Sequence, residues 1–93
     1  MDKLQNIHPG EILLEEFLRP MEISQTRLAQ SISVPPRRIN EIVLGKRGIT
    51  ALPLAKVFGT SVQFWMGLQD EYELCEARSV IKDQLKHMMP IAA

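Results

Sequence analysis

Two short helical faces separated by a turn are visible in SQTRLAQSISVPPRRINEIVL, residues 24–44. On the first face, Leu28 and Ile32 lie four positions apart. On the second face, Ile39 and Ile42 lie three positions apart. Side chains at these spacings share one side of a helix. The stretch therefore predicts two helices that meet through their apolar faces.

The junction between these two faces is short and contains small residues. Ser33 and Val34 form the expected turn, and Ala29 occupies a position where two steeply crossing helices tolerate no side chain larger than a methyl group. A pair of helices joined in this way leaves the second one free to lie in the major groove of DNA. We therefore expect a helix-turn-helix unit and a DNA-binding protein.

Capping and breaking residues divide the rest of the chain into helices as well. The first helix is expected to begin at Pro9 and to end at Pro20, because proline suits the first turn of a helix but disfavours helix at the residue before it. The other four helices are expected within the limits Ser24–Ser31, Pro35–Gly45, Thr50–Gly59 and Ser61–Cys75. No segment shows the alternation typical of a strand, so we expect an all-α fold of five helices in one small domain.

The C-terminal residues 78–93 carry more apolar side chains than a lone exposed helix should: Val80, Ile81, Leu85, Met88 and Met89. These residues either extend the fifth helix or form a further amphipathic helix, which Pro90 would end. We interpret them as an extra C-terminal helical segment that contacts a second copy of the chain or a protein partner. Folding back on the core of the domain is the alternative. The chain thus divides into a helix-turn-helix domain, 1–77, and a C-terminal tail, 78–93.

The net charge of the chain is zero, but its charges are unevenly distributed. Residues 24–60 contain six basic residues and one acid, for a net charge of +5, whereas residues 1–23 carry −3 and residues 61–93 carry −2. A basic surface over the helix-turn-helix is where contacts to DNA phosphates would be made. An ordinary solvated surface is the alternative explanation.

The third helix is the expected recognition helix. Arg37 and Asn40 lie near its N-terminus, the end that usually meets base edges. Arginine can donate two hydrogen bonds to guanine, and asparagine can pair in a similar way with adenine. The alternatives are a surface ion pair between Arg37 and Glu41, and an Asn40 side chain that is simply solvated. Glu41 is the weakest candidate for reading bases, because a carboxylate repels phosphate.

Five further residues are expected to contact the DNA backbone. Arg38, Lys46 and Arg47 suit phosphates, where charge matters more than geometry. Gln25 and Thr26 open the second helix, whose backbone N–H groups can bind another phosphate.

Three segments resemble the HigA (VapI-like) antitoxins of the xenobiotic-response-element helix-turn-helix superfamily. They are HPGEILLEEFLRPMEISQTRLAQSISV, RRINEIVLGKRGIT and LAKVFGTSVQFWMGLQ, and the similarity extends over about residues 7–75. The resemblance implies a lambda-repressor-like domain in the antitoxin of a two-gene toxin–antitoxin module. Members of this family typically dimerise, bind an operator in their own promoter and sequester a HigB-type toxin, a ribosome-dependent mRNA endonuclease.

The chain departs from the family pattern at three places. Ser33 replaces the usual glycine of the turn, so it must accept a left-handed backbone or reshape the turn. Pro35 replaces the usual serine cap of the recognition helix, which then lacks a side-chain cap. GITALPLAKVFGTS stands where the family reads roughly GITADTALRLAKVFGTS, which shortens the chain near Ala51 and Leu52 and places Pro53 at a usual arginine. Three residues are almost one helical turn, so the fourth helix should be short.

Other kinds of chemistry find little support in the sequence. His8 and His87 have no cysteine or carboxylate at metal-ligand spacing, and Cys75 has no neighbouring histidine to act as a base. We therefore expect no metal, no cofactor and no enzymatic activity, and we interpret His8 as the residue that begins the first helix. The single cysteine suits a reducing cytoplasm, and no apolar stretch is long enough to span a membrane.

Three functions are compatible with these observations. The first is an autorepressing antitoxin that binds operator DNA as a dimer and binds its toxin through the acidic face of the first helix or through the C-terminal helices. The second is a stand-alone transcriptional regulator with the same fold. The third is a protein-interaction module that has lost DNA binding, which would be consistent with zero net charge, Ser33 and the short fourth helix.

Overall fold

A computed structural model describes residues 6–91, and every regular element in that range is helical. A continuous helical run comprises α1 (Pro9–Ile12), the π-helical segment η1 (Leu13–Leu18) and α2 (Arg19–Met21). It is followed by α3 (Gln25–Ser31), α4 (Pro36–Val43), α5 (Ala51–Phe58) and α6 (Val62–Leu85). With the first run counted as one helix, the all-α class and the five-helix arrangement are confirmed within the described residues.

The first helical run continues through Pro20, so its expected end at that residue is wrong. The reason lies in η1, where the Arg19 N–H donates to the carbonyl of Leu14, five residues earlier. Proline lacks an N–H and its ring clashes with the carbonyl four residues before it in an α-helix. A wider π turn directly before the proline shifts these carbonyls and relieves that clash. The run ends instead at Met21, and the following residue, Glu22, has a left-handed backbone with φ of 56°.

Serine caps begin two of the helices as expected. The Oγ of Ser24 accepts a hydrogen bond from the Arg27 N–H, and the Oγ of Ser61 accepts one from the Phe64 N–H, each at 3.0 Å. Each bond satisfies one of the free N–H groups in the first turn of a helix. Thr50 occupies the cap position of α5, but its side chain accepts no hydrogen bond there. Gly59 closes α5 with φ of 69°, as the sequence predicts.

The core surrounds Trp65, whose side chain is fully buried at the start of α6. Its indole Nε1–H donates to the Oγ1 of Thr60 at 2.7 Å, so the buried polar atom is satisfied. The Phe17 ring packs against Trp65 with ring centroids 4.9 Å apart. The core is completed by aliphatic side chains from every other helix: Leu13, Leu18, Leu28, Ile39, Ile42 and Leu54. This packing fixes α3 and α4 relative to each other and to the first turns of α6.

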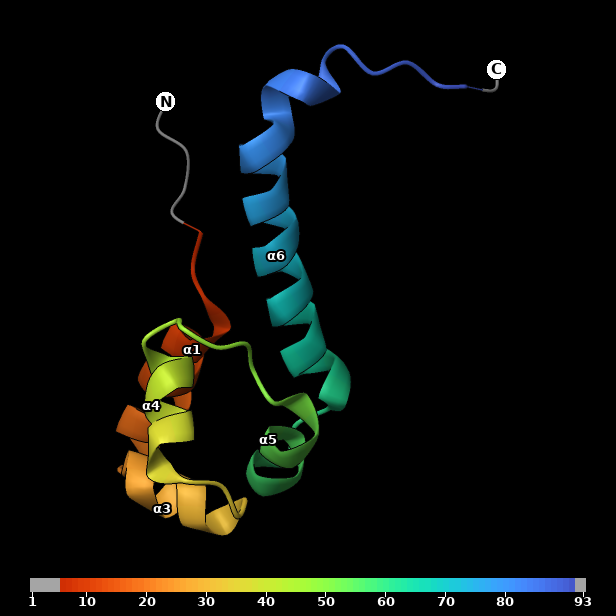
Figure 1. The fold of residues 1–93 in the computed structure, drawn as a ribbon. Coiled ribbons are helices and arrows are strands. Elements are labelled where there is room, and N and C mark those ends of the chain that lie inside the picture. Colours follow the sequence, from red (N-terminus) through yellow and green to blue (C-terminus); the bar gives the residue numbers. More distant parts are fainter. Residues whose placement is uncertain (1–5, 92–93) are drawn as a thin grey trace.

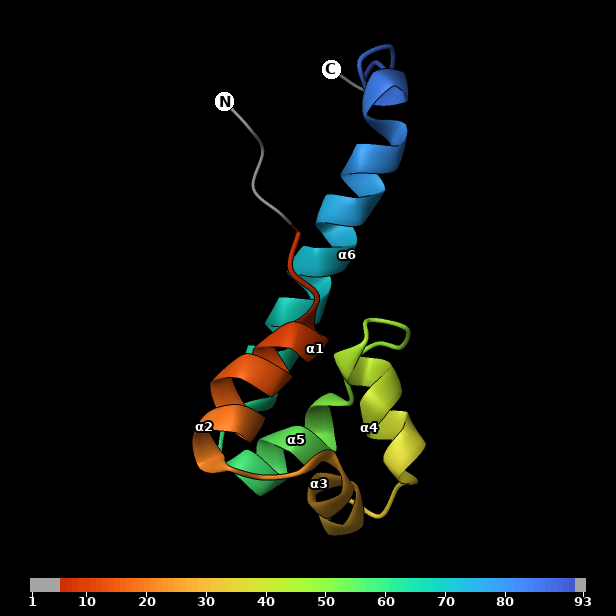
Figure 2. The ribbon, with the colours of Figure 1, turned by 90° about the vertical axis from the view of Figure 1, so that its left-hand side faces the viewer.

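Helix α6 leaves the cluster of shorter helices and extends well beyond it, which makes the molecule elongated, with extents of 51 × 30 × 21 Å (Figure 1, Figure 2). From Glu73 onward every described residue is exposed. None of the helices described here combines the length and apolar character that crossing a membrane requires.

The C-terminal tail extends α6, which passes through residues 77 and 78 as regular helix and is kinked at Ile81, where φ is −113° and ψ is 18°. The alternative in which the tail folds back on its own core is wrong for the described residues, because these side chains are exposed. The helix ends at Leu85 and not, as expected, at Pro90. Pro90 disfavours a helical backbone at Met89, the residue before it, so the helix has to end short of the proline. The outer limits of the proposed division, residues 1–5 and 92–93, lie outside the described residues.

Candidate nucleic-acid interface

The turn between α3 and α4 is closed by two backbone hydrogen bonds. The Val34 N–H donates to the Ala29 carbonyl at 3.0 Å, and the Ser33 N–H donates to the Gln30 carbonyl at 3.3 Å. This pair of bonds is the Schellman pattern that ends many helices. Ser33 has φ of 60°, so of the two alternatives for this serine, the left-handed backbone is the one that occurs. A side chain in this conformation costs roughly 1–2 kcal/mol relative to the ordinary helical backbone.

Helix α4 buries one face and exposes the other in the way the sequence predicts. Ile39 and Ile42 are fully buried, whereas Arg37 and Asn40 are exposed. Pro35 stands at the cap position without a side-chain hydrogen bond, and the helix begins with the Arg38 N–H donating to the Pro35 carbonyl at 2.9 Å. The side chains predicted to read bases therefore project from the first two turns of a firmly packed helix.

The backbone of the first helical run lies unusually close to the backbone of α4, on the side of α4 that faces the core. A Cβ atom at Gly10 would overlap the carbonyl oxygen of Ile42, so only glycine fits there. Gly10 was not singled out in the sequence, because a glycine in the first turn of a helix carries no signal about its tertiary neighbours. This contact fixes the depth at which α4 sits on the domain.

His8 joins three parts of the fold beside this contact. It caps α1, as expected, with its Nδ1 accepting a hydrogen bond from the Gly10 N–H at 2.9 Å. Its ring meets the Tyr72 ring of α6 edge-on, with centroids 4.7 Å apart, and lies under Gly45 at the end of α4. Burial of the imidazole lowers the pKa of His8 below its usual range, because the charged form loses hydration.

The loop after α4 is held at both ends. Gly45, with φ of 78°, closes the helix, and the Lys46 N–H donates to the Glu41 carbonyl at 2.8 Å. Further along, the Ile49 N–H donates to the Oε1 of Gln69 on α6 at 2.9 Å. Lys46 and Arg47, both predicted to contact phosphates, are exposed on this fixed loop.

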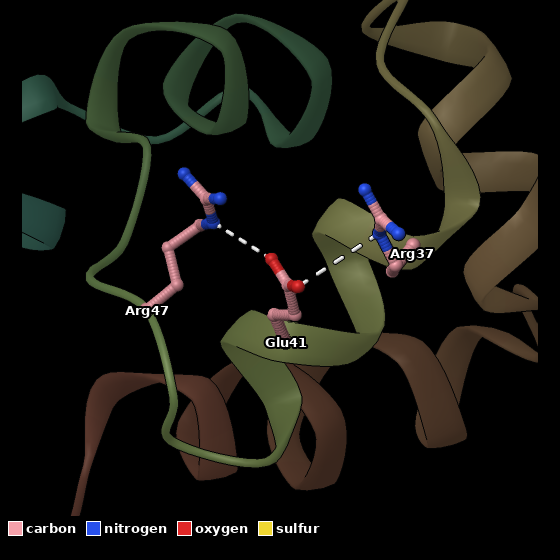
Figure 3. A network of polar contacts seen from close by, with 3 residues as sticks. All are labelled: Arg37, Glu41 and Arg47. Atoms are coloured by element: carbon pink, nitrogen blue, oxygen red, sulfur yellow. Dashed lines mark hydrogen bonds and ion pairs between the residues drawn. The ribbon is translucent and has the colours of Figure 1, made fainter.

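Side-chain contacts join several of the predicted site residues. The Nδ2 of Asn40 donates to the Oε1 of Gln25 at 3.2 Å, which links the recognition helix to the start of α3. The Nε of Arg47 lies 3.0 Å from Oε1 of Glu41, and the Nε of Arg37 lies 3.9 Å from its Oε2 (Figure 3). The Arg37–Glu41 ion pair considered from the sequence is therefore present, but it is the longer of the two. Arg47, the partner of Glu41 on the loop, was not predicted, because the spacing of six residues matches no helical contact.

The remaining predicted phosphate contacts lie around the same surface. Thr26 is exposed beside Gln25 at the beginning of α3, and Arg38 is half-buried on the flank of α4. Glu41 is the sole acidic residue between positions 24 and 60. The surface formed by the start of α3, the outer face of α4 and the following loop is thus basic, with one carboxylate near its centre.

Comparison with known proteins places this arrangement in a family. The chain is 49% identical over 76 residues to virulence-associated protein I of Dichelobacter nodosus, covering 78% of this chain and 70% of that protein. The Pseudomonas aeruginosa antitoxin HigA, solved with the higBA promoter, matches with a TM-score of 0.88 at 41% identity, covering 96% of this chain and 100% of that one. The chain belongs to the HigA family of helix-turn-helix antitoxins.

A HigA-family antidote protein from Coxiella burnetii is also similar, with a TM-score of 0.86 at 40% identity over 94% of this chain and 99% of that one. The antitoxin GraA in complex with its operator gives a TM-score of 0.87 at 31% identity, covering 100% of this chain and 98% of GraA. No family model matches the chain.

The departures from the HigA family pattern are accommodated without loss of the fold. Ser33 takes the left-handed conformation, Pro35 begins α4 without a side-chain cap, and α5 starts directly after Thr50. Helix α5 has eight residues and includes Pro53 in its first turn, where a missing N–H costs nothing. This HigA-family chain therefore retains the helix-turn-helix geometry with an α5 of eight residues.

Proposed function

We propose that this chain is the antitoxin of a two-gene toxin–antitoxin module, that it represses its own operator as a dimer, and that it neutralises a HigB-type mRNA endonuclease toxin. The observation that carries the proposal is the exposed, basic face of α4 on a scaffold that closely matches HigA solved with the higBA promoter and GraA in complex with its operator. The chain acts in this proposal as a binding protein of the cytoplasm and not as an enzyme.

Arg37 and Asn40 are proposed to read bases in the major groove. The Arg37 side chain is 87% exposed and can donate two hydrogen bonds to O6 and N7 of guanine. Asn40 can pair with adenine through Oδ1 and one hydrogen of Nδ2, because the bond to Gln25 occupies only the other hydrogen. The contact with Gln25 thus presents the asparagine amide in a fixed orientation.

The phosphate contacts are proposed to come from residues that frame the recognition helix. They are Gln25, Thr26, Arg38, Lys46 and Arg47. Because the loop after α4 is tied to Gln69 of α6, Lys46 and Arg47 approach the backbone from a rigid support.

The dimer contact is proposed to be the C-terminal half of α6. Val80 is 79% exposed and Leu85 is 44% exposed, which leaves a series of apolar side chains without cover. A second copy packed here would bring two recognition helices to half-sites about one DNA turn, or ~34 Å, apart on an inverted repeat.

The toxin contact is proposed to involve the acidic outer face of the first helical run or the C-terminal helices. Glu11, Glu15, Glu16 and Glu22 are all exposed on or next to that run. An acidic surface suits a basic ribonuclease by electrostatic complementarity.

Two measurements test the proposal. In fluorescence anisotropy, the chain should bind a labelled duplex from directly upstream of its own gene more tightly than a scrambled duplex, with affinity that falls as salt rises. In co-expression, the product of a neighbouring gene for a small basic protein should copurify with it. DNA preference without a toxin complex would instead indicate a stand-alone regulator, and equal or absent binding to both duplexes would indicate a protein-interaction module.

A further inference from the structure

An acidic residue lies at the centre of a surface proposed to face phosphates. Glu41 projects from the second turn of α4, and its side chain is 31% exposed. A carboxylate in this position repels the DNA backbone and weakens binding to every sequence equally.

Glu41 engages two arginines at once, one on each side. Arg37 comes from one turn earlier on α4, and Arg47 comes from the loop that follows (Figure 3). Both arginines approach the carboxylate through Nε, at 3.9 Å for Arg37 and 3.0 Å for Arg47. Figure 3 shows the Nη atoms of both guanidinium groups turned away from the carboxylate. The Nη groups are therefore left available for other acceptors.

This orientation matters because of how arginine recognises guanine. The guanidinium group is a planar fork, and its terminal N–H groups can meet O6 and N7 together. A long, exposed side chain loses much rotamer freedom when it makes that contact. A carboxylate beside Nε restricts the side chain beforehand and directs the fork outward.

Glu41 has a different effect on Arg47, the second arginine. Arg47 makes the shorter contact with Glu41, and its side chain is 48% exposed. While it is paired in this way, part of its charge is neutralised and less of it is offered to phosphates. Glu41 thus opposes the sequence-independent part of DNA binding.

We propose that Glu41 is a specificity-determining positioning residue, which directs Arg37 toward a guanine and limits non-specific phosphate binding by pairing with Arg47. The inference rests on the proposed DNA-binding function. It adds a role for a residue that reads no base itself.

The test uses the full chain and labelled duplexes from its own upstream region, compared with scrambled duplexes and with duplexes in which each G·C pair is replaced in turn. The variants are Glu41→Gln, Arg37→Ala and the double variant. Glu71→Gln, which removes an exposed carboxylate from α6, is the matched control for net charge. Glu41→Asp is a second variant that keeps the charge but withdraws the carboxylate from the arginines.

Glu41→Gln should lower the ratio of upstream to scrambled affinity by about fivefold, the smaller end of what one bidentate guanine contact contributes. On the scrambled duplex, the slope of log affinity against log salt should become steeper by about 0.9, which corresponds to one phosphate contact by an Arg47 that Glu41 no longer holds back from non-specific DNA. In the Arg37→Ala background the same change should no longer affect the preference for the G·C pair. Glu41→Asp should lower the preference as well, because its shorter side chain withdraws the carboxylate from both arginines, and Glu71→Gln should leave the ratio unchanged.

The outcomes separate this inference from the function on which it rests. If the unmodified chain shows no preference for upstream DNA, the proposed function fails and the role of Glu41 fails with it. If the unmodified chain shows the preference and Glu41→Gln retains it, the role of Glu41 is overturned while the function stands. An equal loss of preference with and without Arg37, or with Glu71→Gln, would also overturn the positioning role.

Discussion

The amide of Asn40 donates a hydrogen bond to the side chain of Gln25, and this 3.2 Å contact connects the recognition helix with the first residue of α3. The two residues lie fifteen positions apart in the chain. The contact joins side chains from both helices of the helix-turn-helix into one polar cluster on the proposed DNA surface.

Asn40→Ala should reduce the preference for upstream over scrambled DNA by about 1–3 kcal/mol, the value of one bidentate base contact. Gln25→Ala should reduce it in the same direction by a smaller amount, because the asparagine amide loses its orienting partner. Anisotropy with single-base-pair variants of the duplex should assign both effects to the same A·T pair. Effects at two different base pairs would show that the hydrogen bond between Asn40 and Gln25 has no role in recognising the base.

Arg37→Ala and Lys46→Ala should weaken DNA binding in different ways. Removal of Arg37 should cost about 1–3 kcal/mol on the upstream duplex and relax the preference at one base pair. Removal of Lys46 should weaken binding to upstream and scrambled DNA alike and reduce the salt slope by about 1. A salt series of anisotropy titrations measures both quantities, and interchanged results would contradict the assignment of base and phosphate contacts.

Gly10→Ala should destabilise the fold by about 1–3 kcal/mol, because the added methyl group must push the first helical run away from the Ile42 carbonyl. Gly67→Ala is the matched control, since a Cβ there has open space within an exposed turn of α6. That change should stabilise the helix by up to about 1 kcal/mol. Urea denaturation followed by circular dichroism measures both, and similar stability for the two variants would be inconsistent with the close approach of α1 and α4.

Stability should fall as the pH is lowered below neutrality, through His8. Burial lowers the pKa of His8 in the folded chain, so the unfolded chain takes up its proton first as the pH falls. The stabilisation is therefore fully present above about pH 6.5, the usual value for histidine, and is lost as the pH drops through the folded pKa. Protonation of Nδ1 also removes the acceptor for the Gly10 N–H.

His8→Asn keeps a good capping side chain without a group that titrates in this range. The free energy of unfolding of the two proteins, measured from pH 7.5 to 5.5, should therefore converge toward the acid end. Parallel curves over that range would assign the acid sensitivity to another group.

Charge on the C-terminal half of α6 should separate the proposed dimer. The double variant Val80→Asp and Leu85→Asp places two carboxylates among exposed apolar side chains and should yield a monomer in sedimentation velocity. Affinity for a two-half-site duplex should fall by about 100-fold or more, because the second half-site is no longer bound by a linked copy. Asp83→Asn, an exposed change on the same helix, should leave the dimer intact.

Features governed by neighbours in the sequence were predictable from the sequence. Ser24 and Ser61 cap helices because a serine hydroxyl reaches the N–H three residues later, and Gly59 ends a helix because it can adopt positive φ. The burial of Ile39 and Ile42 follows from helical spacing in the same way. The exposure of Arg37 and Asn40 on the opposite face then follows from the geometry of one helix.

Features that depend on distant contacts were decided only by the tertiary structure. Gln25 meets Asn40, and Arg47 meets Glu41, because α3 and the loop after α4 are brought to the recognition helix by the packing of a shared core. Local sequence therefore determined the helices and their faces, since caps and periodicity act within a few residues. The polar partners on the proposed DNA surface required the folded chain, since only core packing fixes the distance between side chains on different elements.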